Sequence, residues 1–288
     1  MRNVALLCLC FTLFSISAHA ALLDSRVMAV DASEGESEVI VMAEADGRVL
    51  RADARDTVMV EALQAAVVSG VTLRFDLGLK GRINGVMQIA QDKSLVETAN
   101  INKAADAAFV PSVFNTMEDA QAAFNSMSRT YKNKSQCFNR AHVWAYEMWK
   151  NRGISTSKVF IFFTRQYIRK YDFDWWFHVA PYTVVNVNGA SVEHVLDRRY
   201  TAGPRDMRAW TNVFMKNDAF CPEVAKYTDY RNHQREQWCF LIKSNMYYRS
   251  PLDLELLERD GRQETGWVNS EIRAARREAF KNWRNFNP

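Results

Sequence analysis

Three residues combine side-chain types and chain positions that suit nucleophilic catalysis: Cys137, His178 and Asp197. Cys137 opens a predicted helix over residues 137–150, which Gly153 ends, and the free N–H groups of a helix start favour a thiolate. His178 interrupts an apolar strand pattern, where an imidazole needs a polar partner. A thiol, an imidazole and a carboxylate can act as nucleophile, base and orienting group. The three residues therefore predict a Cys-His-Asp triad, in the chain order that papain-like enzymes use.

A predicted β-hairpin brings two of these residues together. Asn188 and Gly189 form a dipeptide that is typical of two-residue hairpin turns. Pairing across this turn sets His178 opposite position 199, so Asp197 comes within reach if Pro181 introduces a bulge. The two strands are expected over residues 175–187 and 191–197.

Other polar residues compete for the same roles. His142 lies on the helix of Cys137 but on a different face, so we expect a structural role for it. His194 could replace His178 if the register shifted, Asn186 is an alternative orienting residue, and His233 is expected at the surface. No set of His, Cys and carboxylate residues has zinc-ligand spacing, so we expect neither a metal nor another cofactor.

The first 20 residues are typical of a secretory signal. Arg2 precedes an apolar run that is too short for a membrane span, and residues 18–20 (Ala-His-Ala) form a small-x-small cleavage site. We expect cleavage before Ala21 and a secreted or periplasmic protein that has no membrane segment after signal removal. An uncleaved anchor is the alternative.

The cysteine count is informative for an exported protein. Two of the five cysteines lie in the signal, and an oxidising compartment then predicts one disulfide and one free thiol. Cys221 and Cys239 are close in sequence and are the expected pair. Cys137 is left as the lone thiol, with a buried packing cysteine as the alternative interpretation.

The composition excludes some classes and divides the chain. It is 48% hydrophobic and 24% charged, which is ordinary for a globular protein. The net charge of +4 is too small to indicate nucleic acid binding, and no zinc-finger or basic-region motif is present. Residues 21–108 contain no Trp and no Cys and predict a small α+β domain that ends in a linker at residues 92–107. Residues 109–288 contain all eight Trp and are expected to form a catalytic domain.

Each segment has a predicted order of elements. The first has strands at residues 26–30, 38–43, 48–54, 71–77 and 83–89, and a helix at residues 56–69. Val58, Val60, Leu63 and Val67 are expected on the buried face of that helix. The second adds helices at residues 116–130 and 207–215, a strand at residues 158–163 and two helices near the C-terminus.

Several motifs resemble those of one enzyme family. Residues 135–142 read Ser-Gln-Cys-Phe-Asn-Arg-Ala-His. They resemble the nucleophile segment of the bacterial protein-glutaminases, or protein-glutamine deamidases, which reads Cys, aromatic, any residue, Arg-Ala-His. Phe-His-Val-Ala at residues 177–180 is also similar, as are Asp197 with the Gly-Pro at residues 203–204 and Trp210 after it. Residues 110–124 resemble the start of the mature enzyme, so the resemblance covers residues 110–215. It departs at Arg198, because the family usually has proline after this aspartate.

The resemblance implies a fold and a mechanism. The fold is a papain/transglutaminase-like α+β catalytic domain, with Cys at a helix N-terminus and His and Asp on an antiparallel sheet. Cys137 becomes the nucleophile, His178 the base and Asp197 the orienting residue, whereas His142 matches a family residue outside the triad. The implied reaction is hydrolysis of the side-chain amide of a glutamine in a protein or peptide, through a cysteine thioester, to glutamate and ammonia.

The resemblance also implies a zymogen. The family is secreted with a pro-region that covers the active site until proteolysis removes it. Residues 21–108 occupy the matching place, so the chain's own N-terminal segment is an expected intramolecular inhibitor.

Three other functions remain open from the residues alone. A transglutaminase would pass the acyl group to an amine, a papain-like protease would cut the backbone, and a binding protein would carry Cys137 only for packing. We also expect Trp175 and Trp176 to line the substrate pocket, with packing of the hairpin as the alternative.

Overall fold

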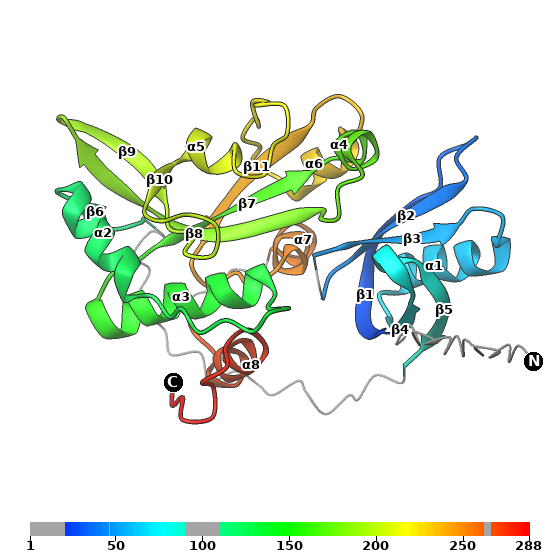
Figure 1. Cartoon of the computed structure of the whole chain (residues 1–288), viewed down its shortest axis with the longest axis horizontal. Helices are drawn as coiled ribbons and strands as arrows, with labels where there is room; N and C mark the ends of the chain where they lie inside the picture. The colour runs from blue at the N-terminus through cyan, green and yellow to red at the C-terminus, as the bar shows by residue number, and fades with distance from the viewer. Residues whose placement is uncertain (1–20, 46, 90–109, 262–265) are drawn as a thin grey trace, which may run out of the picture.

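The structure, a computed structural model, describes residues 21–45, 47–89, 110–261 and 266–288. The predicted signal at residues 1–20, the predicted linker and the predicted domain boundary at residue 108 lie outside the described residues. Figure 1 shows two β-sheets, one in residues 21–89 (the N-terminal unit) and one in residues 110–288 (the C-terminal part). Strand pairing along both sheets is antiparallel except at one short strand, so the mixed α+β class is confirmed.

The N-terminal unit is a five-stranded sheet in the order β3-β2-β1-β4-β5, with one helix packed on it. Its predicted strands and helix are all present. The elements are β1 (Ala21–Asp31), β2 (Glu38–Ala43), β3 (Val49–Asp53), α1 (Thr57–Ser69), β4 (Thr72–Leu77), the short 3-10 helix η1 (Leu79–Gly81) and β5 (Ile83–Gln88). Asp56 caps α1 by accepting from the N–H of Met59, and Gly70 ends it with a φ of 67°.

The buried face of α1 agrees with the prediction except at Val58, since Val60 and Val67 are partly buried against the core that contains Leu63. Leu63 is buried, as expected, and Ala66 is buried beside it, whereas Val58 is 76% exposed. Val58 lies in the first turn of α1, where the apolar periodicity does not correspond to burial.

The C-terminal part is a sheet in the order β10-β9-β8-β7-β11, with β6 parallel to β8. Figure 1 shows α3 lying along β8 and α8 packed beyond α3. The strands are β6 (Val113–Phe114), β7 (Ser157–Phe163), β8 (Phe177–Val187), β9 (Ala190–Val195), β10 (Arg205–Asp206) and β11 (Cys239–Asn245). The helices are α2 (Met117–Ser126), α3 (Cys137–Arg152), α4 (Arg165–Tyr171), α5 (Met207–Thr211), α6 (Tyr227–Asn232), α7 (Pro251–Asp260) and α8 (Asn269–Ala279).

Local sequence explains the elements that position the candidate site. All seven residues of β7 are buried, as expected for an apolar run in the centre of a sheet. Helix α3 begins at Cys137 and ends at Gly153, whose φ is 66°. The turn between β8 and β9 has positive φ at Asn188 and Gly189, as a two-residue hairpin of this type requires.

Three elements are shorter than predicted. Helix α2 ends at Ser126 and not at residue 130, and α5 ends at Thr211 and not at residue 215. Strand β8 begins at Phe177, because Trp175 forms a bridge with Arg48 of the N-terminal unit. Within the described ranges, no helix is both long enough and apolar enough to cross a membrane.

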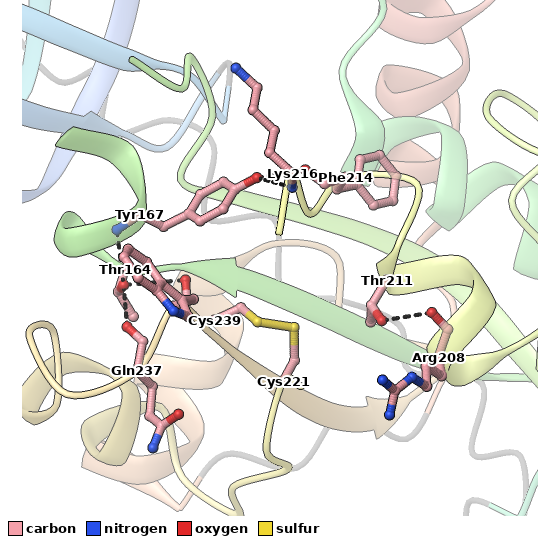
Figure 2. The surroundings of a disulfide bond; sticks show 10 residues. Thr164, Tyr167, Arg208, Thr211, Phe214, Lys216, Cys221, Gln237 and Cys239 are labelled. Atoms are coloured by element: carbon pink, nitrogen blue, oxygen red, sulfur yellow. Dashed lines mark hydrogen bonds between the residues drawn. A yellow bond between two sulfur atoms is a disulfide. The ribbon is translucent and has the colours of Figure 1, made fainter. Parts of the chain in front are cut away.

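A disulfide joins Cys221 to Cys239, as predicted. Figure 2 shows this bond fastening the segment after α5 to the first residue of β11. The same segment is held from the other side by Tyr167, whose hydroxyl donates to the carbonyl oxygen of Phe214 at 2.9 Å and accepts from the N–H of Lys216 at 2.7 Å. The disulfide therefore limits the motion of a segment that contacts the candidate site, as described below.

Replacing both Cys221 and Cys239 by serine is expected to lower the free energy of unfolding by about 3 kcal/mol, because the bond closes a loop between residues 18 apart. Urea denaturation followed by tryptophan fluorescence measures the change. Reduced wild-type protein is the matched control and should show a similar loss. Unchanged midpoints in both samples would contradict a stabilising role for this bond.

Candidate active site

Cys137 is the first residue of α3 and carries a free thiol. Gln136 precedes it in an extended conformation, so the chain turns into the helix at the thiol itself. The first N–H groups of a helix have no partner within it, and their dipoles favour negative charge. Cys137 is only partly buried, so its sulfur is accessible from the pocket it lines.

His178 and Asp197 form a buried pair. The Nε2 atom of His178 lies 2.6 Å from Oδ2 of Asp197, and the two residues are 1% and 0% exposed. The β8–β9 ladder keeps the predicted register, and the N–H of Leu196 continues it by donating to the carbonyl oxygen of Pro181 at 2.8 Å. The expected bulge at Pro181 is wrong, because Asp197 leaves the strand directly after this bond and reaches His178 without one.

Asp197 is fixed by further donors. The indole Nε1 of Trp210 donates to Oδ2 at 3.0 Å, and the backbone N–H of Arg199 donates to Oδ1 at 3.3 Å. Burial alone would raise the pKa of Asp197, but the charge of His178 and the hydrogen bonds from His178 and Trp210 lower it below its ordinary value. Trp210 is therefore part of the site. In the sequence, only the resemblance to the family motif indicated this residue.

The protonation of His178 follows from the same contacts. Burial alone would lower its pKa, but Asp197, followed by Cys137, raises it to about 9. Within the described residues the Nδ1 atom makes no hydrogen bond, and the nearby Cys137 thiol contributes to the raised pKa of His178. At neutral pH His178 is therefore an imidazolium beside a carboxylate and a thiol.

Aromatic rings enclose the imidazole. The rings of Phe214 and Tyr200 have centroids 4.6 and 5.1 Å from that of His178. Trp175 stacks on it at 6.0 Å with an interplanar angle of 23°. These rings exclude water from His178 and Asp197 and so strengthen the attraction between them.

Cys137 and His178 line one pocket of about 120 Å³. Its wall is built from three separate regions of the chain. They are the N-terminal unit (Gly47 and Arg48), the start of α3 with the loop before it (Lys134, Gln136 and Arg140) and the sheet with the turn after β9 (Trp175, Phe177, Arg199 and Tyr200). The N-terminal unit therefore supplies part of the pocket wall.

The two adjacent tryptophans occupy different environments. Trp175 lines the pocket of Cys137 and His178, whereas Trp176 is fully buried and its Nε1 donates to the carbonyl oxygen of Ala43 at 2.9 Å. Consecutive residues of an extended chain point to opposite sides, so both could not face one pocket. The position of Trp176 does not support the prediction that it lines the substrate pocket.

The competing histidines lie elsewhere. His142 is buried on α3, with Nδ1 2.8 Å from Nζ of Lys158, and burial with the charges of Lys158 and Arg249 lowers its pKa well below the ordinary value. His194 pairs with Thr183 in the hairpin, and His233 contacts the carbonyl oxygen of Asp229. The alternative orienting residue, Asn186, accepts from the hydroxyl of Ser191 at 3.0 Å near the hairpin turn.

Arg140 and Arg198 are buried cations close to the site. Arg140 donates to the hydroxyl of Ser135 at 2.9 Å and lies over the ring of Tyr200, which links the start of α3 to the turn after β9. Arg198 donates to the carbonyl oxygens of Asn125 and Met127 at the end of α2. Arg198 therefore ties the turn after β9 to the end of α2.

Comparison with known proteins places this geometry in a class. Residues 110–214 match a family model described as glutaminase. A search of curated proteins found no significant match. The fold is similar to crystal structures of pro-protein-glutaminase and of a mutant of it, with TM-scores of 0.50 and 0.53. Each is 14% identical, and each alignment covers 79% of this chain and 83% of the other. The family model confirms the predicted resemblance to glutaminases over residues 110–214, and the solved structures show a shared fold.

Replacing Asp197 by asparagine is expected to move the pKa of His178 from about 9 to below its ordinary value of 6.5, because burial then acts without the carboxylate. NMR titration of the imidazole measures this shift, and His233 at the surface serves as an internal control. A titration of His178 near 9 in the variant would contradict the role given to Asp197.

The same pKa predicts a pH dependence of stability. Because the folded-state pKa of His178 lies above the unfolded value, its contribution of about 3 kcal/mol is complete below pH 6.5 and is lost as the pH rises through 9. Urea denaturation at pH 6 and pH 9.5 should show this loss in the wild type and a smaller one in the Asp197→Asn variant. Equal losses in both proteins would contradict it.

Proposed function

We propose that this protein is a secreted protein-glutamine deamidase that uses Cys137, His178 and Asp197 as its catalytic residues. The observation that carries the proposal is the buried His178–Asp197 pair, of which His178 lines the same pocket as a free thiol at a helix N-terminus. The family model for residues 110–214 and the shared fold support the choice of the glutamine amide as the reacting group.

The proposed first half of the reaction forms a thioester. The imidazolium form of His178 favours a thiolate on Cys137, which attacks the side-chain carbonyl carbon of a protein-bound glutamine. Backbone N–H groups at the start of α3, including that of Cys137, donate to the developing oxyanion. The C–N bond breaks as His178 gives its proton to the leaving nitrogen, and ammonia leaves a γ-glutamyl thioester.

The second half restores the enzyme. His178, now neutral, takes a proton from a water molecule, which attacks the thioester carbonyl carbon. The C–S bond breaks, glutamate is released within the substrate chain and the thiolate returns. Asp197 keeps Nε2 of His178 engaged throughout, so that Nδ1 is the nitrogen that exchanges protons with the thiol and the substrate.

We propose further that the N-terminal unit keeps the enzyme latent. Gly47 and Arg48 line the pocket of Cys137, and the N–H of Trp176 donates to the carbonyl oxygen of Gly47 at 3.0 Å. A substrate peptide would need the same space. Asp31, which is 5% exposed, anchors the unit by accepting from the guanidinium groups of Arg165 and Arg169 on α4.

Replacing Cys137 by alanine is expected to lower ammonia release from a glutamine-containing peptide by roughly 10⁴-fold or more, because no other thiol can form the acyl intermediate. A coupled ammonia assay on protein treated by limited proteolysis measures the loss. His233→Ala is the matched control and should keep full activity, since this histidine lies outside the pocket.

Four outcomes of this assay would contradict the proposal. Activity retained by a folded Cys137→Ala variant would exclude the nucleophile. Equal ammonia release from free glutamine would exclude the requirement for a protein-bound side chain. Incorporation of a labelled primary amine in place of ammonia release would indicate a transglutaminase, and new peptide termini would indicate a protease.

Replacing Asp31 by alanine is expected to raise the ammonia release of the uncut chain about tenfold, because losing an anchor worth about 1.4 kcal/mol shifts the unit off the pocket. The comparison is between uncut and proteolysed samples of each protein. Asp24→Ala is the control, since Asp24 pairs with Arg74 inside the N-terminal unit. Wild-type protein that is fully active before cleavage would contradict latency.

A further inference from the structure

A short segment of the N-terminal unit lies along the candidate site as an added strand. Arg48 and Trp175 form an antiparallel bridge. On either side of it, the N–H of Val49 donates to the carbonyl oxygen of Asp174 at 2.7 Å, and the N–H of Trp176 donates to that of Gly47 at 3.0 Å. These are main-chain bonds, so any extended peptide could replace the segment.

Three residues after the bridge at Arg48, Arg51 forms ion pairs with the carboxylates of Asp172 and Asp174. The guanidinium of Arg51 lies 2.7 Å from Oδ1 of Asp172 and 3.7 Å from Oδ1 of Asp174. Lys80 approaches Asp172 at 3.7 Å. Within the part of the chain that the structure describes, every ion pair of these two carboxylates is with the N-terminal unit. When the N-terminal unit dissociates, Asp172 and Asp174 lose these ion pairs and become available to a cationic group of another molecule.

The two carboxylates border a groove that continues the catalytic pocket. The groove has a volume of about 460 Å³ and an aromatic wall. Trp175 and Tyr200 line both the groove and the pocket of Cys137. The basic residue on this side of the groove, Lys216, donates to the carbonyl oxygen of Tyr171 at 3.2 Å. A peptide leaving the pocket would pass from an aromatic surface to an acidic one.

We infer that Asp172 and Asp174 form a specificity subsite for a basic residue on the C-terminal side of the target glutamine. This inference rests on the proposed function. Gly47 and Arg48, which line the pocket, precede Arg51 by four and three positions, so the preferred lysine or arginine follows the glutamine at a similar distance. In the N-terminal unit the guanidinium of Arg51 occupies this subsite, three residues beyond the main-chain bridge of Arg48, and supplies the same chemistry as a substrate arginine.

The test uses full-length protein after limited proteolysis and a set of glutamine peptides. Arginine or glutamate is placed at each position from two to five residues after the glutamine, and kcat/KM for ammonia release is measured. We expect arginine to be preferred over glutamate about tenfold at one of these positions, as attraction and repulsion by two exposed carboxylates would produce. The ratio should fall to about twofold when Asp172 and Asp174 are both replaced by asparagine.

Two further variants make the test decisive. Asp172→Lys should reverse the preference in favour of glutamate, whereas Asp260→Asn, at an exposed pair on α7, should keep the wild-type ratio. Equal rates for arginine and glutamate peptides in the wild type would overturn this inference alone. Absence of ammonia release from every peptide would overturn the proposed function and this inference with it.

Discussion

The buried contact between His178 and Asp197 is the constraint on which the rest of the site depends. A carboxylate and an imidazole removed from water are stable only when each has a partner. Asp197 meets this demand with His178, Trp210 and the backbone of Arg199. These bonds join the end of β9, helix α5 and the turn between them to β8. The chemistry and the packing of this region therefore have the same physical origin.

One short segment, residues 174–176, couples the pocket to the N-terminal unit. It pairs with Gly47 and Val49 through main-chain bonds and continues directly into β8, which carries His178. Trp175 contacts the imidazole of His178 and lines both the pocket and the groove, whereas Nε1 of Trp176 donates to the carbonyl oxygen of Ala43. Occupation of the pocket and binding of the N-terminal unit therefore depend on the same few residues.

Much of the fold could be predicted because its signals are local. The Asn-Gly turn set the register of the β8–β9 hairpin as predicted, whereas Asp197 reaches His178 by leaving the strand and not through the expected bulge. Gly70 and Gly153 end their helices with positive φ, and the spacing of Cys221 and Cys239 identified the disulfide. Each of these signals acts over a few residues or one turn, so neighbouring residues suffice to encode it.

The sequence by itself determined the order of the strands and the helix in the N-terminal unit, the hairpin register and the candidate nucleophile at a helix start, whereas it did not predict β6, α4, β10, α6 and β11. The tertiary structure alone decided which tryptophan lines the pocket, that Arg198 binds the end of α2, that Trp210 holds Asp197 and that Arg51 lies on Asp172. These contacts join residues that are up to about 120 positions apart. Such partners follow from how whole elements pack, because no local pattern specifies which distant surface a side chain will meet.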